Sequence, residues 1–298
     1  MAMYPRSSLH NWRLTVSDYW ALTKPEVNVL VLASTLAGFY LGSRGPLSGL
    51  RLAHTLLGTL LVASGTATLN QFIEREYDAR MRRTANRPLP AGRLAPSWAL
   101  GFGVLLSAAG ALDLALAVNA LSSLLALFTL GSYLAFYTPL KRRTPLCTLV
   151  GAFPGAMPPL IGWAAARGSL GREAWVLYAV LFLWQFPHFL GIAWMYREDY
   201  ARAGYIMLPP KDVDGRFTGR EIFVFTLALL PVSLIPVFLN QAGAIYCLGA
   251  SLVGLAFLFC GARLAHARSN ALARRLVLAS VIYLPLLFGL MMVDKIST

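Results

Sequence analysis

Three oxygen-bearing side chains, Asn70, Glu74 and Asp78, are spaced four residues apart at the end of an apolar stretch. The segment 70–84 contains neither Gly nor Pro and predicts a helix, on which residues four apart share one stripe. Carboxylate and amide oxygens on one stripe suit a hard cation such as Mg²⁺. The alternative is a solvated helix end with an Asp78–Arg82 pair. Asn70 weakens that alternative, because it lies deeper in the apolar stretch than a solvated end requires.

Basic residues are dense around these acids: Arg75, Arg80, Arg82, Arg83 and Arg87. Arginine contacts phosphate oxygens directly, whereas carboxylates beside an anion require a divalent metal between them. The mixture therefore indicates a phosphorylated ligand bound together with a metal. Pro88 is expected to end the helix, because proline disfavours helical geometry at the preceding residue.

A second cationic segment, 137–145, is a compact turn that contains two prolines. Lys141 and Arg142 are expected to hold a diphosphate while Tyr137 faces the reacting groups. A membrane anchor of the kind that places positive charge on the inner side explains the same residues equally well.

A third polar group lies inside and just after the apolar stretch 173–195. Polar and ionisable groups within a membrane are costly, so Gln185 and His188 indicate function. His188 could face a planar macrocycle or ligate iron; the alternative is an interhelical hydrogen bond near a kink at Pro187. Asp199 is the best metal ligand on this side, since Glu198 points about 100° away on a helix and is expected to be solvated.

The elements that position these groups are transmembrane helices. The chain has 57% apolar and 13% charged residues, which excludes an ordinary water-soluble globule. Its three cysteines have no spacing typical of zinc sites or disulfides. Nine spans are predicted, near 26–42, 53–73, 97–118, 119–137, 146–166, 173–195, 222–240, 242–261 and 276–293. We expect one integral membrane domain, 1–298, with a cytoplasmic segment at 1–24.

Charge sets the expected orientation. Alternating loops place 21 of the 26 basic residues on the side of the N-terminus and 5 on the other, so the N-terminus is expected in the cytoplasm and the C-terminus outside. The net charge of +13 then reflects topology, and no nucleic-acid partner is expected. The second, fourth and sixth spans all end on the cytoplasmic side, where the three polar groups collect.

Together these motifs resemble the UbiA-type intramembrane prenyltransferases, and within them the branch that farnesylates protoheme IX, the haem O synthases. The matching residues form a series along the chain: Thr23-Lys24-Pro25, Asn70-x-x-x-Glu74-x-x-x-Asp78, Arg83-Thr84, Arg87-Pro88-Leu89-Pro90, Tyr137-Thr138, Leu140-Lys141-Arg142, Gly155 to Trp163, Trp184-Gln185-x-Pro187-His188-Phe189 and Asp199 to Pro209. Two departures stand out. Glu74 occupies a position where the superfamily usually has Asp, and Met195 and Ala203 replace the acids of a second D-x-x-x-D motif.

The resemblance implies an all-α fold of about nine helices around a central cavity open to the cytoplasmic side, in a bacterial inner membrane. It implies Mg²⁺ as cofactor, farnesyl diphosphate as donor and haem b as acceptor, giving haem O, with a haem A synthase or terminal oxidase assembly as further partner. The expected roles are metal binding by Asn70, Glu74, Asp78 and Asp199, catalysis by these four with Tyr137 and Lys141, diphosphate binding by Arg75, Arg82, Arg83, Arg87, Lys141, Arg142 and Arg197, and haem contact by His188.

Two rival functions are compatible with parts of the pattern. A sister prenyltransferase acting on an aromatic quinone precursor would share the Asn70–Asp78 stripe, but would normally carry the second D-x-x-x-D motif. A membrane transporter would use intramembrane polar groups as a substrate path, but predicts inverted repeats and broken helices in matching halves.

Overall fold

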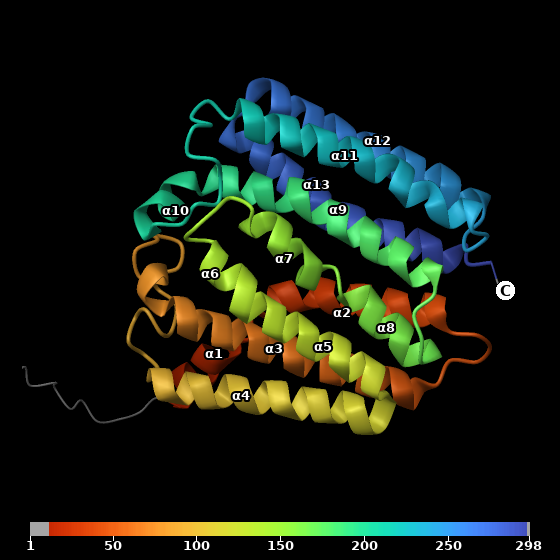
Figure 1. Cartoon of the computed structure of the whole chain (residues 1–298), viewed down its shortest axis with the longest axis horizontal. Coiled ribbons are helices and arrows are strands. Elements are labelled where there is room, and N and C mark those ends of the chain that lie inside the picture. The colour runs from red at the N-terminus through yellow and green to blue at the C-terminus, as the bar shows by residue number, and fades with distance from the viewer. Residues whose placement is uncertain (1–11, 297–298) are drawn as a thin grey trace, which may run out of the picture.

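The computed structural model describes residues 12–296, and within them nine helical units are long and apolar enough to cross a membrane. The expected all-α fold is confirmed (Figure 1). The units are α2 (Pro25–Gly42), α3 (Gly49–Asp78), α4 with a π-helical end (Pro96–Val118), α5 to α6 (Ala120–Leu140), α7 and α8 (Cys147–Arg167), α9 (Arg172–Met195), α11 (Arg216–Phe238), α12 (Ala244–Ala267) and α13 (Asn270–Val293). Two short helices, α1 (Trp12–Leu22) and α10 (Arg197–Ala203), lie outside the spans.

The second, fourth and sixth spans end on the same side of the bundle, as the alternation of loops predicts. Figure 1 shows the end of α3, the short helix α6 and α10 at one end, opposite the C-terminus. Polar groups that are far apart in the sequence are therefore brought to a common region.

Two further spans are also built from shorter pieces. The fourth consists of α5 (Ala120–Ser132), a π-helical turn (Tyr133–Tyr137) and α6 (Thr138–Leu140). The fifth consists of α7 (Cys147–Gly155) and α8 (Pro158–Arg167), because Pro158 and Pro159 have no N–H to continue the helical ladder. Single π turns are frequent at functional sites, and this one is followed by α6 and then Lys141.

Small residues let neighbouring helices approach closely. A Cβ atom on Gly38 would lie 2.1 Å from the Pro159 carbonyl oxygen, and one on Gly162 would lie 1.9 Å from that of Thr35, so α2 and α8 touch through their backbones. A Cβ atom on Gly65 would likewise meet Ser107 Oγ at 2.2 Å, where α3 contacts α4. Lipid tails are as apolar as leucine, so such close packing is a principal source of helix association in membranes.

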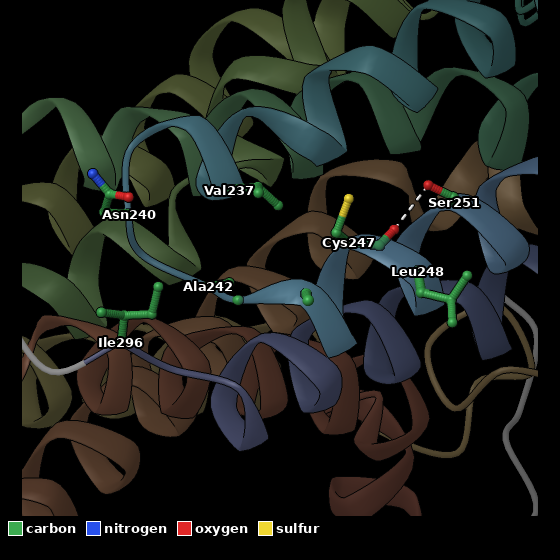
Figure 2. A pocket seen from close by; sticks show the side chains of 9 residues that line it. Val237, Asn240, Ala242, Cys247, Leu248, Ser251 and Ile296 are labelled. Atoms are coloured by element: carbon green, nitrogen blue, oxygen red, sulfur yellow. Dashed lines mark hydrogen bonds between the residues drawn. The ribbon is translucent and has the colours of Figure 1, made fainter.

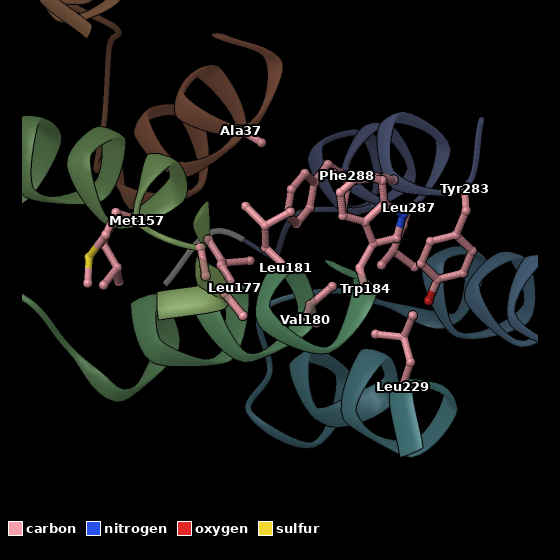
Figure 3. Close-up of a cluster of buried hydrophobic side chains, with 14 of the residues drawn as sticks. Ala37, Met157, Leu177, Val180, Leu181, Trp184, Leu229, Tyr283, Leu287 and Phe288 are labelled. Carbon is pink, nitrogen blue, oxygen red and sulfur yellow. The ribbon is translucent and has the colours of Figure 1, made fainter. Parts of the chain in front are cut away.

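The largest apolar core surrounds α9. Leu177, Leu181 and Trp184 of α9 face Leu287 and Phe288 of α13 (Figure 3). The Trp184 indole N–H also donates a hydrogen bond of 2.8 Å to the Ser280 carbonyl of α13. This core fixes the sixth span, and with it the position of α10.

The helix that continues the second span ends earlier than predicted. The helix stops at Asp78 and does not continue to the proline at 88. The Asp78 carbonyl accepts hydrogen bonds from the Met81 N–H at 3.2 Å and the Thr84 hydroxyl at 2.8 Å, so tight turns replace the next helical turn. The Asp78 side chain meanwhile binds Arg87. The seventh and ninth spans also begin about six residues earlier than predicted, at Arg216 and Asn270.

Candidate active site

The predicted stripe on α3 is present and buried. Asn70, Glu74 and Asp78 have relative exposures of 2%, 6% and 1%. The Asn70 side-chain N–H donates to Glu74 Oε2 at 3.0 Å and to Thr138 Oγ1 at 3.2 Å. The amide therefore links the stripe on α3 to the short helix α6.

Lys141, just beyond α6, is paired with this stripe. Its Nζ lies 2.9 Å from Glu74 Oε1 and 3.0 Å from Oε2, and both side chains are buried. Burial alone would lower the pKa of Lys141, but the Glu74 carboxylate more than offsets it and holds that pKa well above the ordinary value. Lys141 is thus a fixed cation beside the acids.

Tyrosine rings surround the Lys141 ammonium. Its Nζ lies 4.5 Å from the ring centroid of Tyr137, 5.9 Å from that of Tyr133 and 6.0 Å from that of Tyr205. Tyr137 packs where Gly151 leaves room, since a Cβ atom there would meet its ring at 2.5 Å. Aromatic faces attract a cation without neutralising it, so the rings stabilise the ammonium while Glu74 remains its ionic partner.

Lys24 belongs to the same cluster, although we assigned it no role from the sequence. Its Nζ donates to Asn70 Oδ1 at 3.4 Å. Burial, then repulsion by Arg87 and Lys141, lowers the pKa of Lys24 to about 7. The signal was its place in the Thr23-Lys24-Pro25 motif, but nothing in the sequence puts that motif beside α3.

Asp78 is paired with Arg87 rather than with Arg82. Arg87 Nη1 lies 2.7 Å from Asp78 Oδ2. The Asp78–Arg82 pair considered as the alternative is not formed; Arg82 is exposed, and its backbone N–H faces Asp199 Oδ1 at 3.4 Å. The turns after α3 therefore bring Arg87 back to Asp78, the last acid of the stripe.

Asp199 approaches from the other side. It is buried on α10, whereas Glu198 is exposed, as the 100° offset predicts. Its carboxylate bonds to Arg202 of the same helix and to the loop that follows α3. This contact ties α10 to the loop that carries Arg87.

The remaining arginines divide into two groups. Arg83 donates to the Tyr200 hydroxyl at 2.6 Å, and Arg142 donates to the Tyr77 hydroxyl; both are exposed at the rim. Arg75 and Arg197 bind partners outside the acidic cluster. Arg75 donates to the Phe72 carbonyl at 2.7 Å and pairs with Glu76, whereas Arg197 donates to Trp194 and Asn270, each at 2.8 Å.

The polar residues of α9 have structural partners. His188 Nδ1 lies 2.7 Å from Ser280 Oγ of α13, which is the interhelical hydrogen bond considered as the alternative for this residue. The Gln185 side-chain N–H donates to the Ala152 carbonyl at 3.0 Å. The helix itself continues through Pro187.

Tyr205, also missed in the sequence, follows α10 and completes the cluster. Burial, then the negative charge of Glu74, raises the pKa of its phenol well above the ordinary value. Its hydroxyl lies beside the Glu74 carboxylate but forms no well-aligned hydrogen bond with any of residues 12–296.

The donor chemistry fits a hard divalent cation, because the buried ligands on α3 and α10 are all oxygens. The carboxylates do not converge on one point, and no cluster of three His, Cys, Asp or Glu residues is found in the described part of the chain. Lysine or arginine instead neutralises each of Glu74, Asp78 and Asp199. A metal ion that carries an anionic ligand can replace these basic residues beside the carboxylates, while the basic residues turn to the anionic ligand.

A separate depression lies elsewhere in the molecule. It has a volume of about 520 Å³ and is formed by the end of α11, the start of α12 and Ile296 (Figure 2). Its polar groups include Asn240 and Ser251, and Ser251 is already bonded to the Cys247 carbonyl at 2.8 Å. None of its lining residues in the described part of the chain is charged, so it offers no comparable chemistry.

Comparisons with known proteins identify relatives of this chain. A protein named protoheme IX farnesyltransferase from Solibacter usitatus is 55% identical over 287 residues, covering 93% of this chain and 98% of its own. One of the same name from Salinibacter ruber is 48% identical over 277 residues, covering 93% and 98%.

Solved structures share the fold at low sequence identity. A digeranylgeranylglyceryl phosphate synthase superposes with a TM-score of 0.74 at 17% identity, covering 94% of this chain and 98% of its own. A UbiA homologue from Archaeoglobus fulgidus, bound to GPP and Mg²⁺, superposes with a TM-score of 0.67 at 16% identity, covering 92% and 99%. The sequence profile of the UbiA prenyltransferase family matches residues 31–287. This integral membrane chain therefore belongs to the UbiA prenyltransferase family.

Proposed function

We propose that the chain transfers the farnesyl group of farnesyl diphosphate to a vinyl group of haem b, forming haem O. The observation that carries the proposal is the buried cluster of Glu74 with Lys141 and Asp78 with Arg87, in a chain 55% identical to a protein named for this activity. The cluster alternates acids with bases, which suits a metal-bound diphosphate and no simple apolar ligand.

Glu74, Asp78 and Asp199, with the Asn70 amide oxygen, would hold Mg²⁺. When bound, Mg²⁺ neutralises diphosphate oxygens and makes the diphosphate a better leaving group. Glu74 replaces the usual aspartate with a side chain one methylene longer, and the cluster contains a single acid from α10. In a site with four acids and two metal ions, the metals would neutralise most of the diphosphate charge. Here the basic residues therefore neutralise a larger share of that charge.

Lys141, Lys24 and Arg87 neutralise the leaving group. As the allylic C–O bond breaks, negative charge grows on the diphosphate, and preorganised cations stabilise it at no reorganisation cost. The exposed Arg82, Arg83 and Arg142 lie at the rim and attract the anion to the site. Arg75 and Arg197, which bind other partners in the structure, have no part in this proposal.

The farnesyl carbon then bonds to a haem vinyl carbon, and a water molecule supplies the hydroxyl group and releases a proton. Apolar surroundings protect the first cation from water, which explains a site within the membrane. Tyr137 faces this region from the fourth span. His188 is proposed to contact haem through the ring face or edge that its bond to Ser280 leaves available.

We further propose that the whole chain is one prenyltransferase domain in a bacterial inner membrane, with the N-terminus and a cavity opening on the cytoplasmic side. The 21 to 5 asymmetry of basic residues supports this orientation. A haem A synthase or terminal oxidase assembly would be the natural recipient of haem O.

The test is to incubate purified full-length protein with haem b, farnesyl diphosphate and Mg²⁺ and to identify haem O by mass. Haem O must appear, and must disappear with excess EDTA. Prenylation of 4-hydroxybenzoate but not haem would favour a quinone-precursor enzyme. Absence of any prenylated product would overturn the proposal.

A further inference from the structure

Tyr205 is held against the cluster by the loop that follows α10. The Ile206 N–H donates to the Lys141 carbonyl at 2.6 Å. This backbone bond holds Tyr205, the residue before Ile206, close to Lys141. Met207 Sδ lies 3.7 Å from Cys147 Sγ, which anchors the other side of the loop. The Tyr205 ring is only 7% exposed, and its centroid lies 5.8 Å from that of Tyr77.

The Tyr205 hydroxyl lies beside the Glu74 carboxylate without forming a well-aligned hydrogen bond to it. Neighbouring tyrosines differ in this respect. The Tyr77 hydroxyl accepts from Arg142 and the Tyr200 hydroxyl accepts from Arg83. Tyr205 is thus the buried phenol of this cluster that finds no partner among the described residues.

A buried hydroxyl without a partner costs stability, and phenylalanine at the same position would avoid that cost. Such an unsatisfied donor, facing the charged groups assigned to the diphosphate, is expected when a ligand completes its hydrogen bonding.

We propose that Tyr205 is a further diphosphate-binding residue, whose hydroxyl donates a hydrogen bond to a diphosphate oxygen when the ligand enters between Glu74 and Lys141. This inference rests on the proposed function for the identity of the ligand. It adds to that function a neutral donor from the α10 side, where the second D-x-x-x-D motif is absent.

The chain offers a matched control. Tyr283 of α13 is also buried, at 1% exposure, and its hydroxyl also lacks a partner in the described part of the chain. Its ring stacks on Phe257 at 5.0 Å within the apolar core of the C-terminal helices. Tyr205→Phe and Tyr283→Phe remove the same atom from two buried tyrosines.

The experiment measures binding of inorganic diphosphate, with Mg²⁺ present, to the detergent-purified full chain by calorimetry. Tyr205→Phe should weaken binding about tenfold or more, the effect of one hydrogen bond to a charged group, and should raise the KM for farnesyl diphosphate similarly. Its melting temperature should equal or exceed that of the wild type. Tyr283→Phe should leave diphosphate binding unchanged.

Wild-type binding by Tyr205→Phe would overturn the inference, as would equal losses in both variants or a lower melting temperature for Tyr205→Phe, because each indicates a hydroxyl with another role. The proposed function fails separately. If the wild type makes no haem O but its diphosphate binding still depends on Tyr205, the role of Tyr205 in diphosphate binding is supported and the assigned reaction is wrong.

Discussion

Two lysines, at opposite ends of the bundle, lie against tyrosine rings but have different partners. Lys141 bonds to the Glu74 carboxylate, with Tyr137 at 4.5 Å. Lys295 donates to the Tyr40 and Ser43 carbonyls at 2.8 and 2.7 Å, with the Tyr40 ring at 5.1 Å. The first pairs with a charge, and the second caps the C-terminus of α2.

The difference separates a binding site from a structural clamp. A carboxylate can exchange its lysine for a metal while the lysine turns to the metal's anionic ligand. The carbonyls at the end of α2 have no such substitute, so Lys295 serves to hold the C-terminal segment to the bundle. Burial, then Arg167, lowers the pKa of Lys295, whereas Glu74 raises that of Lys141. Partner chemistry, more than burial, therefore distinguishes Lys141 from Lys295.

Lys141→Ala should have the largest effect. Loss of a preorganised cation beside the leaving group should reduce kcat by a factor on the order of 100 to 1,000. Steady-state formation of haem O measures the effect, with gel filtration as a check that the variant remains folded. Near wild-type turnover would contradict the view that Lys141 belongs to the binding site while Lys295 is structural.

Asp78→Asn keeps the shape but removes one ligand charge from the stripe. Metal affinity depends on ligand charge, so the Mg²⁺ concentration for half-maximal activity should rise on the order of tenfold. A Mg²⁺ titration of turnover gives the result. An unchanged titration curve would mean that Asp78 pairs with Arg87 only and does not bind the metal.

The sequence predicts the nine spans and the shared stripe of Asn70, Glu74 and Asp78, because membrane length and helical period are local properties of the chain. It does not predict the end of α3, because the hydrogen bonds of Asp78 decide it. The approach of Lys24 and Tyr205 to Glu74 was missed for a similar reason: residues 50 and 131 positions away meet only through tertiary packing. The roles of the site residues stay predictions.

Lys24 allows a pH test. Its lowered pKa means that the folded protein loses this positive charge as pH rises through about 7, before farnesyl diphosphate binds. The kcat/KM for farnesyl diphosphate should therefore fall about tenfold per pH unit above that value. Lys24→Arg stays charged and should flatten the profile. A wild-type profile that matches that of Lys24→Arg would exclude Lys24 from the site.

Lys295→Met should affect stability but barely affect catalysis. Loss of the hydrogen bonds to the α2 carbonyls should cost about 1–3 kcal/mol. Thermal unfolding in detergent would detect the loss, while kcat of the folded fraction should stay within about twofold of the wild type. A large loss of kcat with unchanged unfolding would instead make Lys295 part of the catalytic machinery.

The most direct measurement is a crystal structure of the full chain with Mn²⁺ and a non-reactive farnesyl thiodiphosphate, with Mn²⁺ located by anomalous scattering. We predict that Mn²⁺ lies within coordination distance of Glu74 and Asp78, and that Lys141 has moved from Glu74 to the diphosphate. Mn²⁺ bound elsewhere, with the Lys141–Glu74 pair intact, would contradict the account.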